Sequence, residues 1–362
     1  MPREPLEAIL LVGGQGTRLR PLTLSAPKPL LPTAGVPFLA HVLARAAAGG
    51  VTHVVLATCY KADMFAAAFG DGSAFGLAID YVTEDVPLDT GGGIRNAAAS
   101  LRGREPGDPV VVLNSDVLSG HDLSAQIDLH GKTEAAVTLH LVEVADPSRF
   151  GVVPTDDSGR VTAFLEKTPN PVTNRINAGC YVFRREVIDQ IPAGRRVSVE
   201  RETFPGLIES GQLVMGYHES AYWLDVGTPQ TFVRGSCDLV LGRLPAPAVP
   251  GPAGPALLLA GAEVAPDASV SGGTVVGAGA SVGAAATVSG SVLFDSATVG
   301  AGAVVRDSIV GRGSVVAPGA VLDDAVLGDG AFVGAGNELA RGIRIWPGVR
   351  LEPTSVRFST DV

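Results

Sequence analysis

A six-residue period of aliphatic side chains runs through the last third of this 362-residue chain. Glycine, alanine, serine and aspartate fill most positions between them, as in "VVGAGASVGAAATV". Such a period matches neither an α-helix nor a single strand, and it is typical of a β-helix with triangular coils. We therefore expect a left-handed parallel β-helix over residues 257–362. The periodic residues form three series: Val264, Val270, Val276, Val282 and Val288; Leu293, Val299 and Val305; and Ile309, Val315, Val321, Leu327, Val333, Leu339, Ile345 and Leu351.

A glycine- and alanine-rich linker is the alternative interpretation, but a linker has no core for regularly spaced aliphatic residues to fill. Small residues fit the tight corners of a β-helix, which explains much of the glycine count of 46. Just before the repeat, residues 243–256 carry five prolines and show no periodicity, so we expect a stiff linker there. The predicted domains are therefore residues 1–242 and 257–362.

The first domain alternates short apolar runs with helical stretches. Runs at 7–12, 53–58, 78–82, 110–114 and 135–142 read as strands, and 38–48, 63–69 and 124–132 read as helices. Continuous apolar strands alternating with helices predict an α/β fold with a Rossmann-like, mostly parallel sheet covered on both faces. Ligands of such sheets bind at the carboxyl ends of the strands.

Charge and cysteine content exclude several classes of partner. The formal net charge of -10 argues against nucleic acid or an anionic membrane surface as partner. Three widely spaced cysteines, Cys59, Cys180 and Cys237, form neither a disulfide framework nor a metal cluster. The apolar run near the start is too short for a signal peptide or a membrane span. We expect a cytoplasmic protein.

The stretch "GGQGTRLRPLTLSAPKP" follows the first predicted strand. Gly13, Gly14 and Gly16 leave backbone N–H groups open to an anion, although an ordinary glycine turn would look the same. Arg18 offers a planar fork to phosphate oxygens and Lys28 a compact charge. The chain has only four lysines, and we expect the prolines beside Lys28 to hold it on an extended stretch.

The complete string G-G-x-G-T-R-L-x-P-L-T-x-x-x-P-K-P, residues 13–29, resembles the signature of the sugar-1-phosphate nucleotidyltransferases. This family joins a nucleoside triphosphate to a sugar 1-phosphate and releases pyrophosphate. Further segments resemble its landmarks in family order, so that the resemblance covers essentially the whole chain. They are "PLDTGGGIRN" (87–96), "VLNSDVL" (112–118), "FGVV" (150–153), "FLEK" (164–167), "INAGCYVF" (176–183), "VSVERETFP" (197–205) and "YWLDVGTP" (222–229).

The resemblance implies a role for each matching residue. The implied catalytic residues are Arg18, Lys28, Asp116, Lys167 and Asp225, with Mg²⁺ held by Asp116 and Asp225. The implied nucleotide-binding residues are Gly13, Gly14, Gly16, Thr17, Arg18, Lys28, Glu84, Thr90 and Gly91. The implied sugar-phosphate-binding residues are Asp116, Gly151, Glu166, Lys167 and Asn177.

Three positions depart from the family pattern. Asp89 and Ser115 stand where the family usually has glycine, and Thr168 stands where it usually has proline. None of these changes removes a charged catalytic group, but they affect segments that select the nucleotide and sugar. A carboxylate from Glu84 or Asp89 could accept hydrogen bonds from the N1–H and N2–H₂ edge of guanine.

The strings "LTLSAPKP", "INAGCYVF" and "SVERETFP", in this order, resemble those of the guanylyltransferases, and this resemblance favours GTP and α-D-mannose 1-phosphate. The guanylyltransferases that act on this sugar commonly append a β-helix, which is why the resemblance covers the repeat as well. One alternative is another sugar 1-phosphate, such as glucose 1-phosphate with TTP, UTP or ATP. Another is a non-catalytic regulatory subunit that binds a sugar nucleotide. Some hexapeptide β-helices are acyltransferases with a catalytic histidine, but no histidine lies in this repeat. The open ends of a β-helix lead us to expect a homo-oligomer.

Overall fold

The computed structural model describes residues 6–59, 61–103 and 105–357. The chain divides into two compact units, the first with residues 6–14 and 42–223 and the second with residues 15–41 and 224–357. The predicted domains had different boundaries, and their outermost residues, 1–5 and 358–362, lie outside the described part. The division differs because residues 15–41 and the helix before the linker pack with the repeat.

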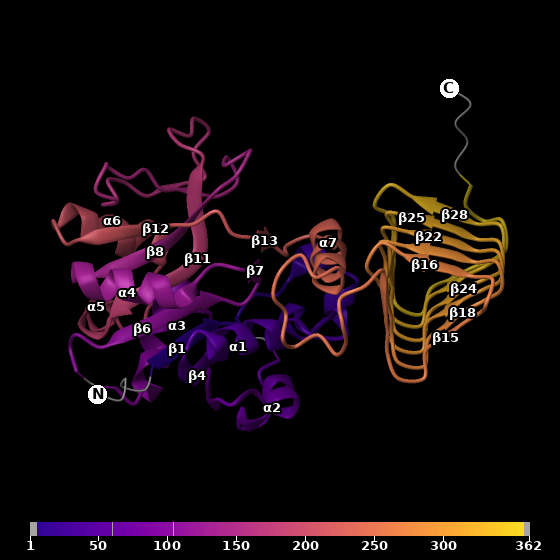
Figure 1. Ribbon diagram of the computed structural model, residues 1–362, viewed down its shortest axis with the longest axis horizontal. Helices are drawn as coiled ribbons and strands as arrows, with labels where there is room; N and C mark the ends of the chain where they lie inside the picture. Colours follow the sequence, from indigo (N-terminus) through magenta and orange to yellow (C-terminus); the bar gives the residue numbers. More distant parts are fainter. Residues whose placement is uncertain (1–5, 60, 104, 358–362) are drawn as a thin grey trace. The chain divides into compact units, whose positions relative to one another are not determined.

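A nine-stranded sheet forms the centre of the first unit (Figure 1). Its main path is β10-β9-β11-β6-β1-β4-β5, and β8 pairs with both β11 and β12. The neighbours β6, β1, β4 and β5 are parallel, whereas β11 runs antiparallel to β6, β8 and β9. The strands are β1 (Leu6–Leu11), β4 (Val51–Thr58), β5 (Ala78–Thr83), β6 (Pro109–Asn114), β8 (Val137–Glu143), β9 (Gly151–Val152), β10 (Leu165–Glu166), β11 (Arg175–Arg184) and β12 (Val214–His218).

Helices pack on this sheet, α3 against β1 and β4, and α4 against β6, β8 and β11. The predicted helices at 38–48, 63–69 and 124–132 are confirmed. Helix α4 begins after Asp122, whose carboxylate accepts a hydrogen bond from Ala125 N at 3.0 Å. The helices are α1 (Phe38–Ala48), α2 (Asp63–Phe69), α3 (Asp89–Ala97), α4 (Leu123–Thr133), α5 (Arg185–Gln190) and α6 (Phe204–Glu209), with the short turns η4 (Ser73–Phe75), η5 (Ala98–Ser100) and η6 (Val199–Thr203) and the strand β7 (Val117–Ser119).

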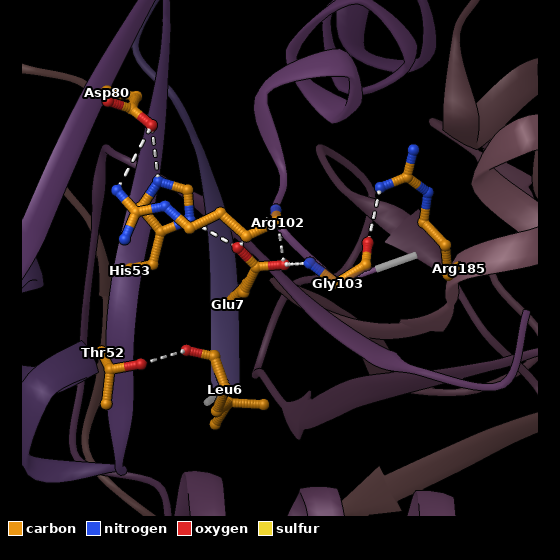
Figure 2. Close-up of polar contacts among 8 residues, drawn as sticks. All are labelled: Leu6, Glu7, Thr52, His53, Asp80, Arg102, Gly103 and Arg185. Carbon is orange, nitrogen blue, oxygen red and sulfur yellow. Dashed lines mark hydrogen bonds and ion pairs between the residues drawn. The ribbon is translucent and has the colours of Figure 1, made fainter. Parts of the chain in front are cut away.

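A polar network centred on the buried Glu7 and His53 lies at the amino ends of the parallel strands, away from the predicted site (Figure 2). The Glu7 carboxylate accepts hydrogen bonds from the backbone N–H groups of Arg102 and Gly103 and contacts His53 Nδ1. On the other side of the ring, His53 Nε2 lies 2.8 Å from Asp80 Oδ2. This network joins β1, β4 and β5 to the loop before β6, and it satisfies a carboxylate that burial would otherwise destabilise.

The repeat in the second unit folds as the predicted β-helix, with three parallel sheets stacked coil upon coil (Figure 1). The first sheet has β14 (Ala256–Leu258), β17 (Thr274–Val276), β20 (Val292–Leu293), β23 (Ile309–Val310), β26 (Val326–Leu327) and β29 (Arg344–Ile345). The second has β15 (Glu263–Val264), β18 (Ser281–Val282), β21 (Thr298–Val299), β24 (Val315–Val316), β27 (Phe332–Val333) and β30 (Arg350–Leu351). The third has β16 (Ser269–Ser271), β19 (Thr287–Ser289), β22 (Val304–Arg306), β25 (Val321–Asp323) and β28 (Glu338–Ala340).

Part of the third periodic series is displaced by one position from the residues that point inward. Ile309, Val315 and Val321 belong to the series, but the β-helix core holds their neighbours Val310, Val316 and Leu322. The phase slips more often than the sequence pattern suggested, because the corner after each of β19, β22 and β25 is one residue shorter than the corner after β16. A serine at the first of these short corners joins successive coils, since Ser291 Oγ accepts from Ser308 N at 3.1 Å and donates to Ser289 O.

Helix α7 (Pro229–Val240) belongs to the second unit and packs against β17 and β20. Thr228 and Thr231 form a reciprocal capping box at its start, and Phe232 packs edge-on against Phe294 of the β-helix. The remaining elements of this unit are η1 (Thr17–Leu19), η2 (Leu22–Leu24), η3 (Lys28–Leu30), β2 (Pro32–Thr33) and β3 (Val36–Pro37), and β13 (Trp223–Asp225) spans the boundary between units. Within the described ranges, no helix has the length and apolar character to cross a bilayer.

Candidate active site

The predicted site residues fall into both units. Gly13, Gly14, Glu84, Thr90, Gly91, Asp116, Gly151, Glu166, Lys167 and Asn177 lie in the first unit, and Gly16, Thr17, Arg18, Lys28 and Asp225 lie in the second. Within the first unit they follow the carboxyl ends of strands or lie on the neighbouring β9, β10 and β11.

Gly13 and Gly14 follow β1 directly. Val12 N still donates to Ala57 O of β4 at 3.0 Å, and both glycines after it are exposed. A Cβ atom at Gly14 would meet nothing within 4 Å, and one at Gly13 would meet only Cys59 Cβ at 3.7 Å. Their backbone is therefore open to an approaching ligand, although the space alone would also admit small side chains.

Asp116 lies half-buried in the turn after β6. The preceding Ser115, one of the departures from the family pattern, donates its hydroxyl to Leu11 O at 2.6 Å. This hydrogen bond joins the ends of β6 and β1, so that the serine fixes the backbone next to Asp116. On the other side, Gly179 has φ +77° and packs on Asn114, where a Cβ atom would come within 2.9 Å of Nδ2.

Glu84 follows β5, and its carboxylate accepts a hydrogen bond from Leu88 N at 2.9 Å. Burial raises the pKa of this carboxyl above its usual value, and the nearby charge of Asp89 raises the pKa further. A Cβ atom at Gly93 would lie 2.8 Å from Glu84 Oε1, so glycine at this point of α3 lets the carboxylate lie against the helix. Glu84 thus holds the loop that leads into α3.

Asp89, the second departure, begins α3 with φ +64°. This left-handed region favours glycine, the usual family residue, and aspartate is one of the few other residues that tolerate it. Its carboxylate accepts from Thr90 N at 2.9 Å and lies 3.7 Å from Arg196 Nη2. The substitution therefore keeps the backbone conformation and pairs the added charge with an arginine.

Thr90 and Gly91 connect α3 to the segment 197–200. Thr90 Oγ1 donates to Glu200 Oε2 at 2.8 Å and accepts from Val199 N at 3.0 Å. Gly91 N donates to Val197 O at 2.7 Å. Through these hydrogen bonds, the segment "VSVERETFP" holds the start of the helix in "PLDTGGGIRN".

Four of the predicted sugar-phosphate residues lie on β9, β10 and β11 or directly after β10: Gly151, Glu166, Lys167 and Asn177. Gly151 pairs with Glu166, and a Cβ atom at Gly151 would lie 2.7 Å from the Phe164 ring and 3.0 Å from Glu166 Oε2. The exposed Lys167 places Nζ 3.5 Å from Glu166 Oε1. These neighbours form one polar patch that can offer both a cation and hydrogen-bond acceptors to a ligand.

Asn177 is oriented by a buried tyrosine that the sequence pattern did not single out. Asn177 Nδ2 donates to Tyr181 Oη at 2.8 Å, and Asn177 Oδ1 accepts from Gly179 N at 3.1 Å. Burial raises the pKa of the Tyr181 hydroxyl well above its usual value, so this group stays protonated. The position of Tyr181 inside "INAGCYVF", four residues after Asn177, was the signal that could have identified it.

In the second unit, Lys28 is 8% exposed and lies in the turn η3 rather than on the extended stretch we expected. Pro27 before the turn and Leu31 at its end are extended, and Leu30 N and Leu31 N donate to Pro27 O and Lys28 O to form the turn. The prediction failed because Pro29 takes one of the first two positions of that turn, where proline is readily accommodated.

The signature loop, residues 16–20, is held against the rest of the second unit. Gly16 has φ +60°, and a Cβ atom there would lie 2.9 Å from Lys28 Cβ. Thr23 Oγ1 donates to Gly16 O at 3.0 Å. The guanidinium of Arg18 lies over Gly227, where a Cβ atom would come within 2.7 Å of Nη2. Glycine at position 227 of "DVGTP" therefore lets the Arg18 side chain lie directly against the backbone.

A divalent metal would have to rely on few protein ligands. Among the described residues, no group of three or more histidine, cysteine, aspartate or glutamate side chains could hold a metal ion. Asp116 and Asp225 are both half-buried carboxylates at turns or strand ends. Hard carboxylate oxygens from one or two residues, completed by water and substrate phosphate, suit Mg²⁺ better than a closed site for zinc.

Known protein families match both the nucleotidyltransferase part and the β-helix part of the chain. The family described as "Nucleotidyl transferase" matches residues 7–240, and the "GMPPB C-terminal domain" matches residues 253–357. The chain is 58% identical over 363 residues to the mannose-1-phosphate guanylyltransferase of Mycobacterium tuberculosis (strain ATCC 25618 / H37Rv), with 100% of both chains covered. It is 38% identical to the mannose-1-phosphate guanyltransferase of Candida albicans over 235 residues, which cover 64% of each chain.

Solved structures share the fold of the first part. HddC from Yersinia pseudotuberculosis, complexed with GMP-PN, aligns with a TM-score of 0.55 and 26% identity over 65% of this chain and 99% of that one. A putative glucose-1-phosphate thymidylyltransferase from Bacillus anthracis aligns with a TM-score of 0.58 and 21% identity over 64% of this chain and 94% of that one. The signature at residues 13–29, the strand-end residues and the family match over residues 7–240 agree, and the chain belongs to the nucleotidyl transferase family.

Proposed function

We propose that this chain transfers GMP from GTP to α-D-mannose 1-phosphate, giving GDP-mannose and pyrophosphate. The observation that carries the proposal is the 58% identity to a mannose-1-phosphate guanylyltransferase over the full length of both chains. The aligned region includes the β-helix as well as the nucleotidyltransferase part, so the two proteins are similar over both domains.

In the proposed reaction, a phosphate oxygen of the sugar 1-phosphate attacks the α-phosphorus of GTP. The new bond joins that oxygen to the α-phosphorus, the bond to the bridging α–β oxygen breaks, and pyrophosphate leaves with the electron pair. Both reactants are polyanions, so catalysis consists mainly of positioning and charge neutralisation. We assign Arg18, Lys28 and the open backbone at Gly13, Gly14, Gly16 and Thr17 to the triphosphate.

We assign the polar patch on β9, β10 and β11 to the sugar 1-phosphate. Lys167 supplies the charge for the phosphate, and Glu166 and Asn177 supply groups for the sugar hydroxyls. Gly151 leaves the space beside Glu166 free of a side chain, because a Cβ atom there would collide with Phe164 or Glu166. Glu84, Thr90 and Gly91 are assigned to the nucleotide, with Glu84 also holding the loop before α3.

We assign Mg²⁺ to Asp116 and Asp225, whose hard oxygen donors suit this ion. When bound, the ion would neutralise charge on the phosphate oxygens. Ser115, through its hydrogen bond to Leu11 O, holds the backbone beside the first carboxylate. We further propose that the protein works in the cytoplasm as a homo-oligomer, since a β-helix presents open ends to a second copy.

Pyrophosphate release measured over GTP, ATP, UTP and TTP, each with several sugar 1-phosphates, tests the proposal. We expect the highest kcat/KM with GTP and mannose 1-phosphate, and none without a divalent cation. A preference for TTP with glucose 1-phosphate would refute the substrate assignment. Turnover with no pair would refute the enzyme assignment and favour a non-catalytic subunit.

A further inference from the structure

One outward position on the first sheet of the β-helix breaks a regular column. The register aligns Val275, Val292, Ile309 and Val326 on successive coils, and all four are at most 2% exposed. The next residue in this column is Arg344, which is exposed. Its neighbour Ile345 points into the core, so Arg344 points outward like the aliphatic residues before it.

The guanidinium of Arg344 contacts the signature loop of the same unit. Its Nη1 donates to Arg18 O and to Arg20 O, each at 2.8 Å. Both carbonyls belong to the short turn η1 and its end, where helical carbonyls lack partners within the turn. A charged donor to a carbonyl forms a stronger hydrogen bond than a neutral one. Arg344 is therefore well suited to fix this end of the loop.

Two further contacts hold other parts of the loop. Thr23 donates a hydrogen bond to Gly16 O at the beginning of the loop, and the Arg18 guanidinium lies against Gly227. Arg18 thus has its side chain seated on Gly227 and its own carbonyl held by Arg344. Losing the hydrogen bonds of Arg344 would free the backbone from which the Arg18 side chain projects.

We propose that Arg344 is a positioning residue for nucleotidyl transfer, through which the β-helix holds the loop that carries Arg18. This inference rests on the proposed function, because Arg18 is assigned to the triphosphate only there. It gives the β-helix a part in catalysis beyond stability and assembly. It also accounts for an arginine where the four preceding coils have a valine or isoleucine.

Arg344→Met tests the proposal, because methionine keeps much of the length and removes every donor. We expect kcat/KM for GTP to fall about tenfold to a hundredfold, the range for a misplaced positioning group, through a changed KM for GTP or kcat. The KM for mannose 1-phosphate should change little. Arg344→Lys keeps a charged donor near the same carbonyls and should recover most of the activity.

Arg350→Met is the matched control. Arg350 lies on β30 of the last coil and stacks 4.1 Å over the Phe332 ring, so its loss removes the same charge and tests general damage to the β-helix. Its kinetics should stay within about twofold of the parent, within the usual effect of a surface change. Equal losses in both methionine variants would overturn the proposal.

Amide hydrogen exchange of the substrate-free protein gives a readout that needs no activity. Exchange in residues 16–24 should be faster in Arg344→Met than in the parent and in Arg350→Met, while exchange in the first unit stays the same. Faster exchange without a kinetic loss, or unchanged exchange, would overturn the proposal. If the parent turns over no substrate pair, the proposed function fails, and the exchange data alone then decide whether Arg344 fixes the loop.

Discussion

Three buried histidines make the first unit sensitive to acid. Burial, the largest cause, lowers the pKa of His121 to about 2, of His130 to about 4 and of His140 to about 3. The charge of Arg45 lowers the first and third further, and its Nη2 lies 2.7 Å from His121 Nδ1. Arg184 acts in the same direction on His130. All three rings are therefore neutral in the folded protein near neutral pH.

The sign of the pH effect follows from proton linkage. Each folded pKa lies below the unfolded value of about 6.5, so below that pH the unfolded chain binds more protons than the folded chain. The stabilisation is complete above pH 6.5 and is lost as the pH falls. Between pH 6.5 and 5, where an unfolded histidine goes from half protonated to almost fully protonated, each histidine costs about 1.6 kcal/mol and the three together about 5 kcal/mol. Such a loss is comparable to the whole stability of many domains.

His130→Asn isolates one of these contributions. His130 Nδ1 lies 3.0 Å from Thr138 Oγ1, a contact that an asparagine amide can replace, whereas His130 Nε2 is buried without a hydrogen-bond partner among the described residues. The variant should lose about 1.6 kcal/mol less than its parent between pH 6.5 and 5. Carboxylates that titrate in this range contribute equally to both proteins, so the difference reports the histidine.

Urea denaturation at pH 7.5, 6.5, 5.5 and 5.0 measures this difference. The chain has two tryptophans, Trp223 in the first unit and Trp346 in the second, so a Trp346→Phe background makes fluorescence report the first unit alone. An identical pH dependence in His130→Asn and its parent would refute the reasoning.

Three further predictions concern the candidate site. Asp225→Asn should abolish metal-dependent pyrophosphate release with an unchanged circular dichroism spectrum, and a near-parental rate would refute its assignment as a metal ligand. Gly151→Ala should raise the KM for the sugar 1-phosphate about tenfold but not that for GTP, because the added Cβ would lie 2.7 Å from the Phe164 ring; equal changes in both KM values would contradict this. Thr90→Val should destabilise the first unit by about 2 kcal/mol, since it removes two hydrogen bonds, and an unchanged urea midpoint in the same fluorescence assay would argue against it.

Local patterns in the sequence were sufficient to predict the elements and the family. Helices 38–48 and 63–69 have the predicted limits, because their periodicity and ends depend on neighbouring residues. The aliphatic period predicted the β-helix, since each coil repeats the same inward positions. The signature at residues 13–29 identified the family because its glycines and charges are contiguous.

Other features depended on contacts between distant parts of the chain. The inward-facing position is Val310 rather than Ile309 because the preceding corner is one residue shorter. The length of that corner depends on how one coil stacks on the next. No local sequence pattern indicates that residues 15–41 group with the β-helix. The grouping depends on contacts between residues more than 300 positions apart in the sequence, such as Arg18 and Arg344. The sequence by itself determined the fold class, the signature and the charged groups. Only the tertiary structure decided which side chains position those charged groups. Hydrogen bonds such as that from Arg344 to Arg18 O join residues that no local pattern brings together.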